Sequence, residues 1–164
     1  MHRHRWNQLL GAACLLVAGG VAAMIVLVFS GSSSAAPSKA EYFARVAEIC
    51  GYYGPQLSAI PTPSDFAVPG TVAEPIRQAL PLVLAETREL KALTPPKELT
   101  TDVKRWLALR DRAIATLKQT LHDADLPDIR LLGPDWLRFL DQNKAARAAA
   151  ADIGIPTVCS TRSA

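Results

Sequence analysis

The chain has 164 residues, of which 49% are hydrophobic and 20% charged, with 18 lysines and arginines against 15 acidic residues. This length suits one domain with a short extension, and the mean hydropathy of +0.13 is too high for a disordered chain. The 12 prolines and 9 glycines follow no period, which excludes fibrous repeats. The three cysteines are too few for a disulfide-dense miniprotein, and none forms a Cys-x-x-Cys zinc pair.

The positive charge is divided unevenly along the chain. Arg3 and Arg5 account for two of the three net positive charges. From Ser38 onward the chain contains the other 16 basic residues and all 15 acidic residues. A nucleic-acid-binding protein needs a dense basic patch that displaces counterions from phosphates. The even mixture of signs instead predicts a solvated protein surface and no nucleic-acid partner.

A long apolar segment opens the chain. Residues 9–29 carry no charge over 21 positions. A helix of this length spans roughly 31 Å, which matches a bilayer core of about 30 Å. The basic residues in positions 1–8 favour a cytoplasmic N-terminus under the positive-inside rule. We therefore expect a cytoplasmic n-region, a single transmembrane signal-anchor that gives the chain the membrane as a partner, and a C-terminal domain outside the cell membrane.

Two other interpretations of this segment stay open. Ser34, Ala35 and Ala36 have the small side chains of a signal-peptidase site, and cleavage there would release a secreted protein. However, a cleavable signal has an apolar core of only about 7–15 residues, and Pro37 is a poor first residue for the product. A lipoprotein box ending at Cys14 would have almost no hydrophobic core before it. These points favour the uncleaved anchor.

The rest of the chain is predicted to be all-α. Residues 30–37 (SGSSSAAP) resemble a flexible linker. Residues 38–164 contain four stretches in which apolar residues recur every three or four positions, and they show no alternating strand pattern. Four amphipathic helices with short connections bury their apolar stripes most simply as an up-and-down bundle. We therefore expect an extracytoplasmic four-helix up-and-down bundle, closed by one disulfide.

Capping signals place the helix boundaries. Ser38 with Glu41, and Thr71 with Glu74, each form a capping box that begins a helix. Gly154, followed by an apolar residue and a proline, predicts the end of the last helix. The predicted helices start at Ser38, Thr71, about Lys97 and Pro134, with the third ending at Ala124. Pro55 is expected to kink or end the first helix, and Pro81 to bend the second. Their main buried residues are Tyr42, Val46, Ile49, Cys50, Tyr53, Leu57 and Ile60; Val72, Ile76, Leu80, Val83, Thr87 and Leu90; Leu99, Val103, Trp106, Ala113, Leu117 and Leu121; and Trp136, Phe139, Leu140, Ala146, Ala150 and Ile153.

Two cysteines lie in the domain expected outside the cell. Cys50 falls beside the apolar stripe of the first helix, and Cys159 follows the last helix. An oxidising compartment favours a disulfide between them. Closing a loop of about 109 residues is worth up to about 4.7 kcal/mol in the chain-entropy model. The alternative is a reactive thiol, but His122 is the one histidine outside the n-region and no local Cys-His pattern supports it.

No catalytic or cofactor motif is present, so we expect neither an enzyme nor a cofactor. His122, Asp123, Asp125 and Asp128 gather one imidazole and three carboxylates, but their spacing departs from the calcium-loop pattern. We interpret them as a polar helix end and turn, and predict no metal site. Glu86 and Glu89 lie three residues apart among basic side chains, which is typical of solvated helix surface.

Three polar residues interrupt the apolar stripes. Arg110 falls between Trp106 and Ala113, Asn143 falls on the stripe of the fourth helix, and Thr87 on that of the second. Such hydrogen-bonding groups on core faces suggest a polar core or a site for a small polar or anionic ligand. The alternative is that Arg110 packs its stem along a helix seam and that its head reaches water or an acid.

The combination of one N-terminal apolar segment, Cys50, Thr94-Pro95-Pro96 before a Trp106-bearing helix, and Cys159 is similar to small single-anchor or exported helical proteins of high-GC Gram-positive bacteria. This resemblance implies no activity. We expect a non-catalytic binding or scaffolding module with a protein or small-molecule partner. The alternative is a sensor or carrier that holds a small ligand in the bundle interior, which a cavity bordered by Arg110 and Asn143 would favour.

Overall fold

Four long helices dominate the part of the chain that the computed structural model describes, which is residues 37–126 and 129–155. No strand occurs within these ranges, so the all-α prediction is confirmed for them. The elements are α2 (Lys39–Ser58), α3 (Pro69–Ala92), η1 (Lys97–Leu99), α4 (Thr100–Ala124), η2 (Ile129–Leu131) and α5 (Leu132–Asp152), where η marks a short 3₁₀-helix.

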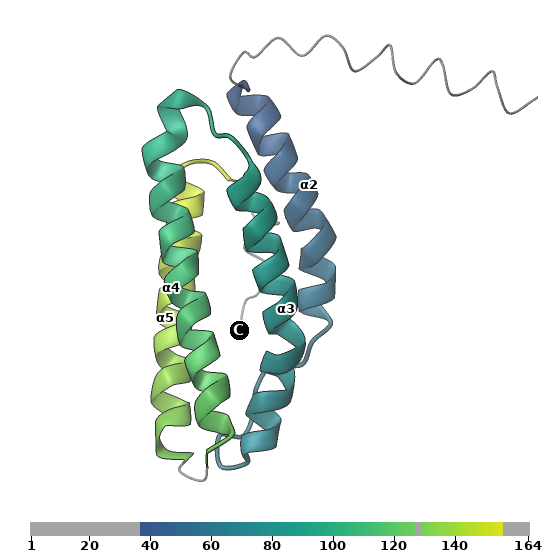
Figure 1. The fold of residues 1–164 in the computed structure, drawn as a ribbon, viewed down its shortest axis with the longest axis vertical. Coiled ribbons are helices and arrows are strands. Elements are labelled where there is room, and N and C mark those ends of the chain that lie inside the picture. The colour runs from purple at the N-terminus through teal and green to yellow at the C-terminus, as the bar shows by residue number, and fades with distance from the viewer. Residues whose placement is uncertain (1–36, 127–128, 156–164) are drawn as a thin grey trace, which may run out of the picture. The chain divides into compact units, whose positions relative to one another are not determined.

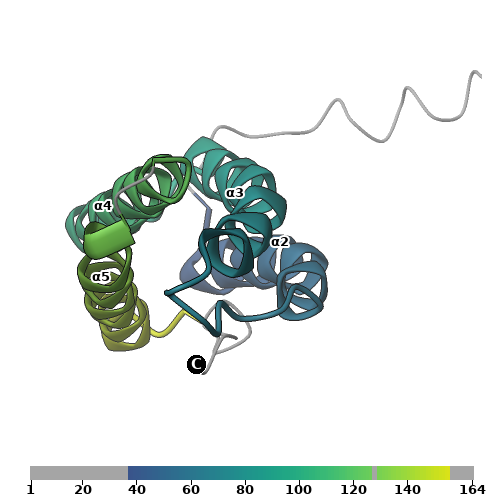
Figure 2. The ribbon, with the colours of Figure 1, turned by 90° about the horizontal axis from the view of Figure 1, so that it is seen from below.

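The four helices form a bundle. Each runs antiparallel to the one before it (Figure 1), and seen end-on they are arranged around one common axis (Figure 2). Backbone packing follows chain order, with α2 against α3, α3 against α4 and α4 against α5, and the last of these pairs is the closest. The prediction of a helical bundle is therefore confirmed. Short connections between antiparallel neighbours explain this order, because each helix buries its apolar stripe against the next.

The start of α2 agrees with its predicted capping box. The Ser38 hydroxyl accepts a hydrogen bond from the backbone N–H of Glu41, and the Glu41 carboxylate accepts one from the backbone N–H of Ser38 at 2.8 Å. Hydrogen bonds from the Ser38 side chain and backbone lower the pKa of Glu41 below its ordinary value of 4.5. Pro55 lies inside the last turn, and α2 ends three residues later at Ser58.

The predicted capping box at the start of the second helix is wrong. The helix begins two residues earlier, at Pro69, with Val68 as its N-cap. The Thr71 hydroxyl donates to the carbonyl of Val68 at 2.8 Å instead of accepting from Glu74. Proline suits the first helical position because an N–H there has no partner within the helix. Pro81 lies inside α3 and does not end it.

The later helices follow their predicted limits within three residues. The third helix divides into η1 and α4, and the fourth starts at Leu132 rather than Pro134, after the short helical turn η2. Gly154 has a φ of +82°, as the predicted helix stop requires. Its N–H donates to Ala151 at 3.0 Å, and that of Ile155 donates to Ala150 at 2.9 Å, which is the Schellman pattern. The glycine stop is therefore confirmed.

The predicted stripes supply a core that divides into two main parts. The Trp106 cluster lies between α2, α3, α4 and the end of α5, and the Trp136 cluster lies toward the other end of α3, α4 and α5. The buried members of the Trp106 cluster are Tyr42, Val46, Cys50, Leu90, Leu99, Val103, Trp106, Ala149, Ala150, Ile153 and Ile155. Those of the Trp136 cluster are Val72, Ile76, Leu117 and Trp136, with Phe66, Leu80, Leu121, Phe139 and Leu140 packed against them.

Several predictions lie outside the described residues. They are the n-region at 1–8, the anchor at 9–29, almost all of the linker at 30–37, and both Cys14 and Cys159. Within residues 37–126 and 129–155, no helix combines the length and apolar character that a bilayer crossing requires. The anchor and the disulfide both stay predictions.

Candidate functional site: a polar layer and a cavity inside the bundle

A layer of polar side chains separates the two parts of the core. Glu86 and Thr87 come from α3, Arg110 from α4 and Asn143 from α5. On each of these helices they fall between the residues of the Trp136 cluster and those of the Trp106 cluster. The antiparallel arrangement brings these middle segments to one level of the bundle. Arg110 contacts both α3 residues directly, and it lines the same cavity as Asn143.

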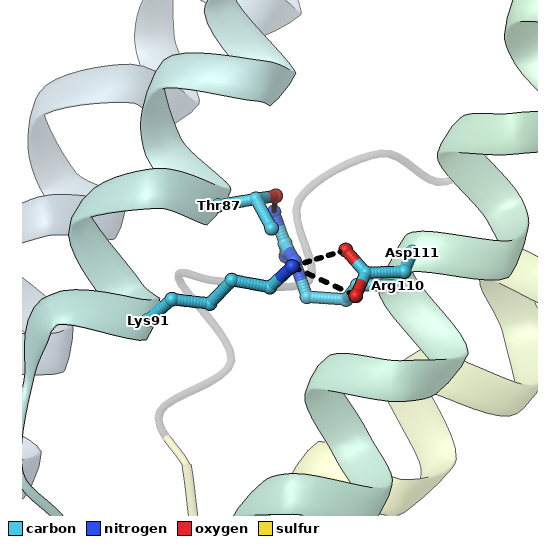
Figure 3. Close-up of polar contacts among 4 residues, drawn as sticks. All are labelled: Thr87, Lys91, Arg110 and Asp111. Atoms are coloured by element: carbon cyan, nitrogen blue, oxygen red, sulfur yellow. Dashed lines mark hydrogen bonds and ion pairs between the residues drawn. The ribbon is translucent and has the colours of Figure 1, made fainter.

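Arg110 is held by α3. Its Nη2 donates to the Glu86 carboxylate at 2.6 Å and to the Thr87 hydroxyl at 3.2 Å. Figure 3 shows the Arg110 side chain reaching from α4 to Thr87. The side chains of Arg110 and Glu86 are only 13% and 6% exposed, so this ion pair is screened far less than a surface pair. The guanidinium carbon also lies 5.7 Å from the Trp106 ring centroid, within the range of a cation–π interaction.

The prediction that Glu86 is solvated surface is wrong. The residue is 5% exposed, whereas Glu89 is exposed and accepts a hydrogen bond from the Tyr53 hydroxyl. Glu86 lies four residues before Leu90, on the same helix face, and this spacing was the available signal. A buried arginine needs a charged partner, and Glu86 supplies it from the facing helix.

The polar layer borders a cavity of about 130 Å³. Arg110, Asn143 and Glu86 line it, together with side chains from all four helices and one proline of the α2–α3 connection. Thr87 does not line this cavity. The other lining residues are Gly54, Leu57, Pro63, Pro75, Ile76, Ala79, Val83, Trp106, Ala113, Ile114, Leu117, Trp136, Phe139, Ala146, Arg147 and Ala150.

A surface groove lies on the outer side of the α3–α4 seam. Thr87 lines this groove, as do Lys91 and Asp111. The Lys91 ammonium contacts both oxygens of the Asp111 carboxylate at 2.7 Å (Figure 3). Both side chains are nearly half exposed, so solvent screening leaves this ion pair with little effect on stability. The structure therefore brings Arg110 to Thr87 and to the cavity edge, whereas Thr87 itself lines the outer groove and Asn143 lines the cavity.

A second polar cluster joins the end of α4 to the start of α5. Asp123 and Asp135 are 2% and 6% exposed. A hydrogen bond with Asp123, and then burial, raise the pKa of Asp135. Gln119 donates to Asp123 at 2.8 Å, and Arg138 lies 3.1 Å from Asp135.

The polar helix end predicted around His122 is only partly as expected. His122 and Asp125 are exposed, and Asp125 pairs with Arg77, but Asp123 is buried. The pairing of Asp123 with a carboxyl on α5 was not visible in the local spacing. Among the described side chains, no three histidine, cysteine or acidic groups come together as a metal site would require. Asp128 lies outside the described residues.

Comparison with protein-family models, with curated proteins and with solved structures finds no match for this chain. The geometry of the bundle interior is therefore the main indication of function.

Proposed function

We propose that the chain is a membrane-anchored, extracytoplasmic domain that binds a small and mostly apolar molecule inside its helical bundle, without catalysing a reaction. One observation carries this proposal, namely the cavity that lies between two apolar clusters and is bordered by Arg110, Glu86 and Asn143. Of the two functions considered from the sequence, the ligand carrier is the one that such a cavity favours.

The composition of the cavity supports a binding role. Small-molecule sites are concave and mostly apolar, with a few polar groups that orient the ligand. This cavity has Trp106, Trp136 and Phe139 in its wall and four polar or charged residues among its lining. Its volume of about 130 Å³ is close to that of an engineered cavity of about 150 Å³ that admits benzene. A ligand of roughly that size fits without moving a helix.

The cellular placement in this proposal depends on the apolar segment at 9–29 and on the predicted disulfide. Cys50 is completely buried and belongs to the same cluster as Ile155. Cys159 follows Ile155 by four residues, which an extended chain spans in about 13 Å. A bond to Cys50 is therefore within reach, and it would fix the C-terminal tail to α2. A disulfide of this kind fits an oxidising compartment.

A scaffolding role is the second candidate. The α4–α5 connection exposes the side chains of Leu126 and Leu131 to 42% and 55%, and Leu137 on α5 is 63% exposed. Exposed apolar side chains at one end of a bundle are typical of a protein interface. Binding of a partner protein there is compatible with a ligand in the interior.

A methyl-NMR titration tests the proposed binding site. Benzyl alcohol, a neutral molecule of suitable size, is added to the full chain in lipid nanodiscs with labelled isoleucine, leucine and valine methyls. We expect shifts at the cavity residues Val83, Ile114 and Leu117, and none at Val46, which lies in the Trp106 cluster away from the cavity. Shifts confined to exposed methyls such as Leu137, or no shifts, would overturn the proposal.

A cavity-filling variant provides the matched control. Ala113 is 4% exposed and lines the cavity, so Ala113→Leu places three extra carbon atoms where the ligand would lie. Ala108 is an exposed position on the same helix, and Ala108→Leu makes the same chemical change outside. We expect only Ala113→Leu to abolish the benzyl alcohol shifts. If Ala113→Leu is too unstable because of overpacking, Ala146→Val tests the same wall from α5.

A further inference from the structure

We infer that the molecule bound in this cavity carries a carboxylate, and that Arg110 and Asn143 receive it. This inference depends on the proposed binding function, because it names the chemical class of ligand for the same site. Three features of the polar layer support it.

The first feature is the unused hydrogen-bonding capacity of Arg110. Within the described residues, its hydrogen bonds all come from Nη2, to Glu86 and Thr87. The other terminal nitrogen, Nη1, keeps two N–H groups. The buried Nε also has no hydrogen-bond partner there. Because a buried donor without a partner is unfavourable, an acceptor delivered to this guanidinium stabilises the bundle.

The second feature is the balance of donors and acceptors on the cavity wall. The cavity lining includes one carboxylate, that of Glu86, and Arg110 already donates to it at 2.6 Å. Asn143 adds an amide from α5, one turn before Arg147, and it forms no hydrogen bond within the described residues. This set favours a ligand with acceptor oxygens over a cation. A hydrogen bond from a guanidinium N–H to a carboxylate is charge-assisted, and it is stronger than one to a neutral acceptor.

The third feature is the apolar material on either side of the polar layer. Trp106 closes the cavity toward one cluster, and Trp136 and Phe139 close it toward the other, with their ring centroids 5.1 Å apart. A compact ring or branched chain fills this space, while its carboxylate lies at the level of Arg110. The ligand class is therefore a small aromatic or branched aliphatic carboxylate.

Three probes of one shape test this inference. Benzoate, benzyl alcohol and benzamidinium are titrated separately into the full chain in nanodiscs, and the shifts of the Ile114 and Leu117 methyls give each dissociation constant. We expect benzoate to bind at least tenfold more tightly than benzyl alcohol, a difference of about 1.4 kcal/mol. Benzamidinium should bind more weakly than either, because its charge faces Arg110.

Variants of the ion pair sharpen the test. Glu86→Gln removes the carboxylate that competes for Arg110, so we expect benzoate to bind several-fold more tightly and benzyl alcohol to stay within about twofold, since only the charge term changes. Glu86→Leu with Arg110→Leu removes both charges and should abolish the preference for benzoate. Arg112→Leu is the matched control, because Arg112 is an exposed arginine on the same helix, and it should change neither affinity.

The outcomes separate this inference from the proposal on which it depends. If none of the three probes shifts the cavity methyls, the binding function itself fails. If benzyl alcohol shifts them but benzoate binds no more tightly, or benzamidinium binds best, the binding function stands and the carboxylate assignment is overturned. A benzoate preference that survives in the Glu86→Leu/Arg110→Leu double variant would overturn the role of Arg110.

Discussion

The Trp106 cluster and the polar layer lie next to each other in one bundle, but they differ in how they are filled. In the cluster, Val46, Cys50 and Leu90 are completely buried. In the layer, Arg110 and Asn143 are only partly buried and border an open volume of about 130 Å³. The cluster therefore holds the helices together, whereas the layer leaves room for something else.

This difference shows that the layer does not add stability in the way the cluster does. Burying an apolar side chain contributes about 1.5–3 kcal/mol. A buried ion pair instead loses most of its Coulombic gain to desolvation. Arg110 and Glu86 in the middle of a helical bundle thus add little to its stability. A ligand that contacts them gives a physical reason for their presence.

The largest effect should come from the cluster. Leu90→Ala removes a fully buried side chain, and we expect it to lower the free energy of unfolding by about 2–5 kcal/mol. Urea denaturation of the full chain in detergent micelles measures this loss. Leu84→Ala is the control on the same helix, because Leu84 is 39% exposed and its truncation should change stability by no more than about 0.5 kcal/mol. Equal effects of the two changes would mean that the cluster is not the stabilising part of the bundle.

Removing both charges of the polar layer should, unlike truncation in the cluster, leave the free energy of unfolding nearly unchanged. Glu86→Leu alone leaves Arg110 buried without its partner, and we expect a loss of about 3 kcal/mol. Adding Arg110→Leu should recover the unfolding free energy to within about 1 kcal/mol of the original protein, because apolar residues replace a buried pair with little net cost. The same denaturation experiment tests both. A double variant as unstable as the single one would show that the pair is structural.

A smaller effect is expected at the end of α5, where Gly154 ends the helix beside the Trp106 cluster. Gly154→Ala forces an alanine into a φ of +82°, which costs about 1–2 kcal/mol. Its Cβ would meet Phe43 at 3.6 Å, an ordinary contact, so the cost is conformational rather than steric. Gly51→Ala, inside α2 with open space around its Cβ, should instead stabilise by about 0.5–1 kcal/mol. The two changes in unfolding free energy should therefore have opposite signs, and equal signs would contradict this account.

The smallest expected effect depends on pH. The pKa of Asp135 is raised in the folded state, so its contribution is complete below the ordinary value of 3.8 and is lost as the pH rises through the raised pKa. Asp135→Asn cannot ionise and does not undergo this loss. The free energy of unfolding of the variant, minus that of the original protein, should therefore be more favourable at pH 7 than at about pH 3.5. Unfolding free energies at the two pH values measure the difference, and a pH-independent difference would contradict the raised pKa of Asp135.

Much of the fold follows from local patterns. The helical stripes predicted most of the buried apolar residues of the four helices. Ser38 and Gly154 marked two helix ends correctly because capping depends on neighbouring residues alone. The start of α3 was missed because Pro69 at the first helical position outweighed the capping pattern at Thr71.

The candidate site was only partly predictable. Arg110 and Asn143 stood out because each interrupts an apolar stripe, and both line the cavity. Glu86 was misjudged although it lies four residues before Leu90, because its charged partner Arg110 is 24 residues away on another helix. The contact between Asp123 and Asp135 also joins two helices. The cavity itself arises from the packing of four helices, and no stretch of sequence contains that information.

The most direct test of the central claim is a measurement of contacts between a bound molecule and the cavity wall. Isotope-filtered nuclear Overhauser spectra of benzoate with the methyl-labelled full chain report which methyls lie near the aromatic ring. The account predicts signals to Ile76, Val83 and Leu117 and none to Val46. Signals only to Leu84 in the outer groove, or to no methyl of the bundle, would contradict it.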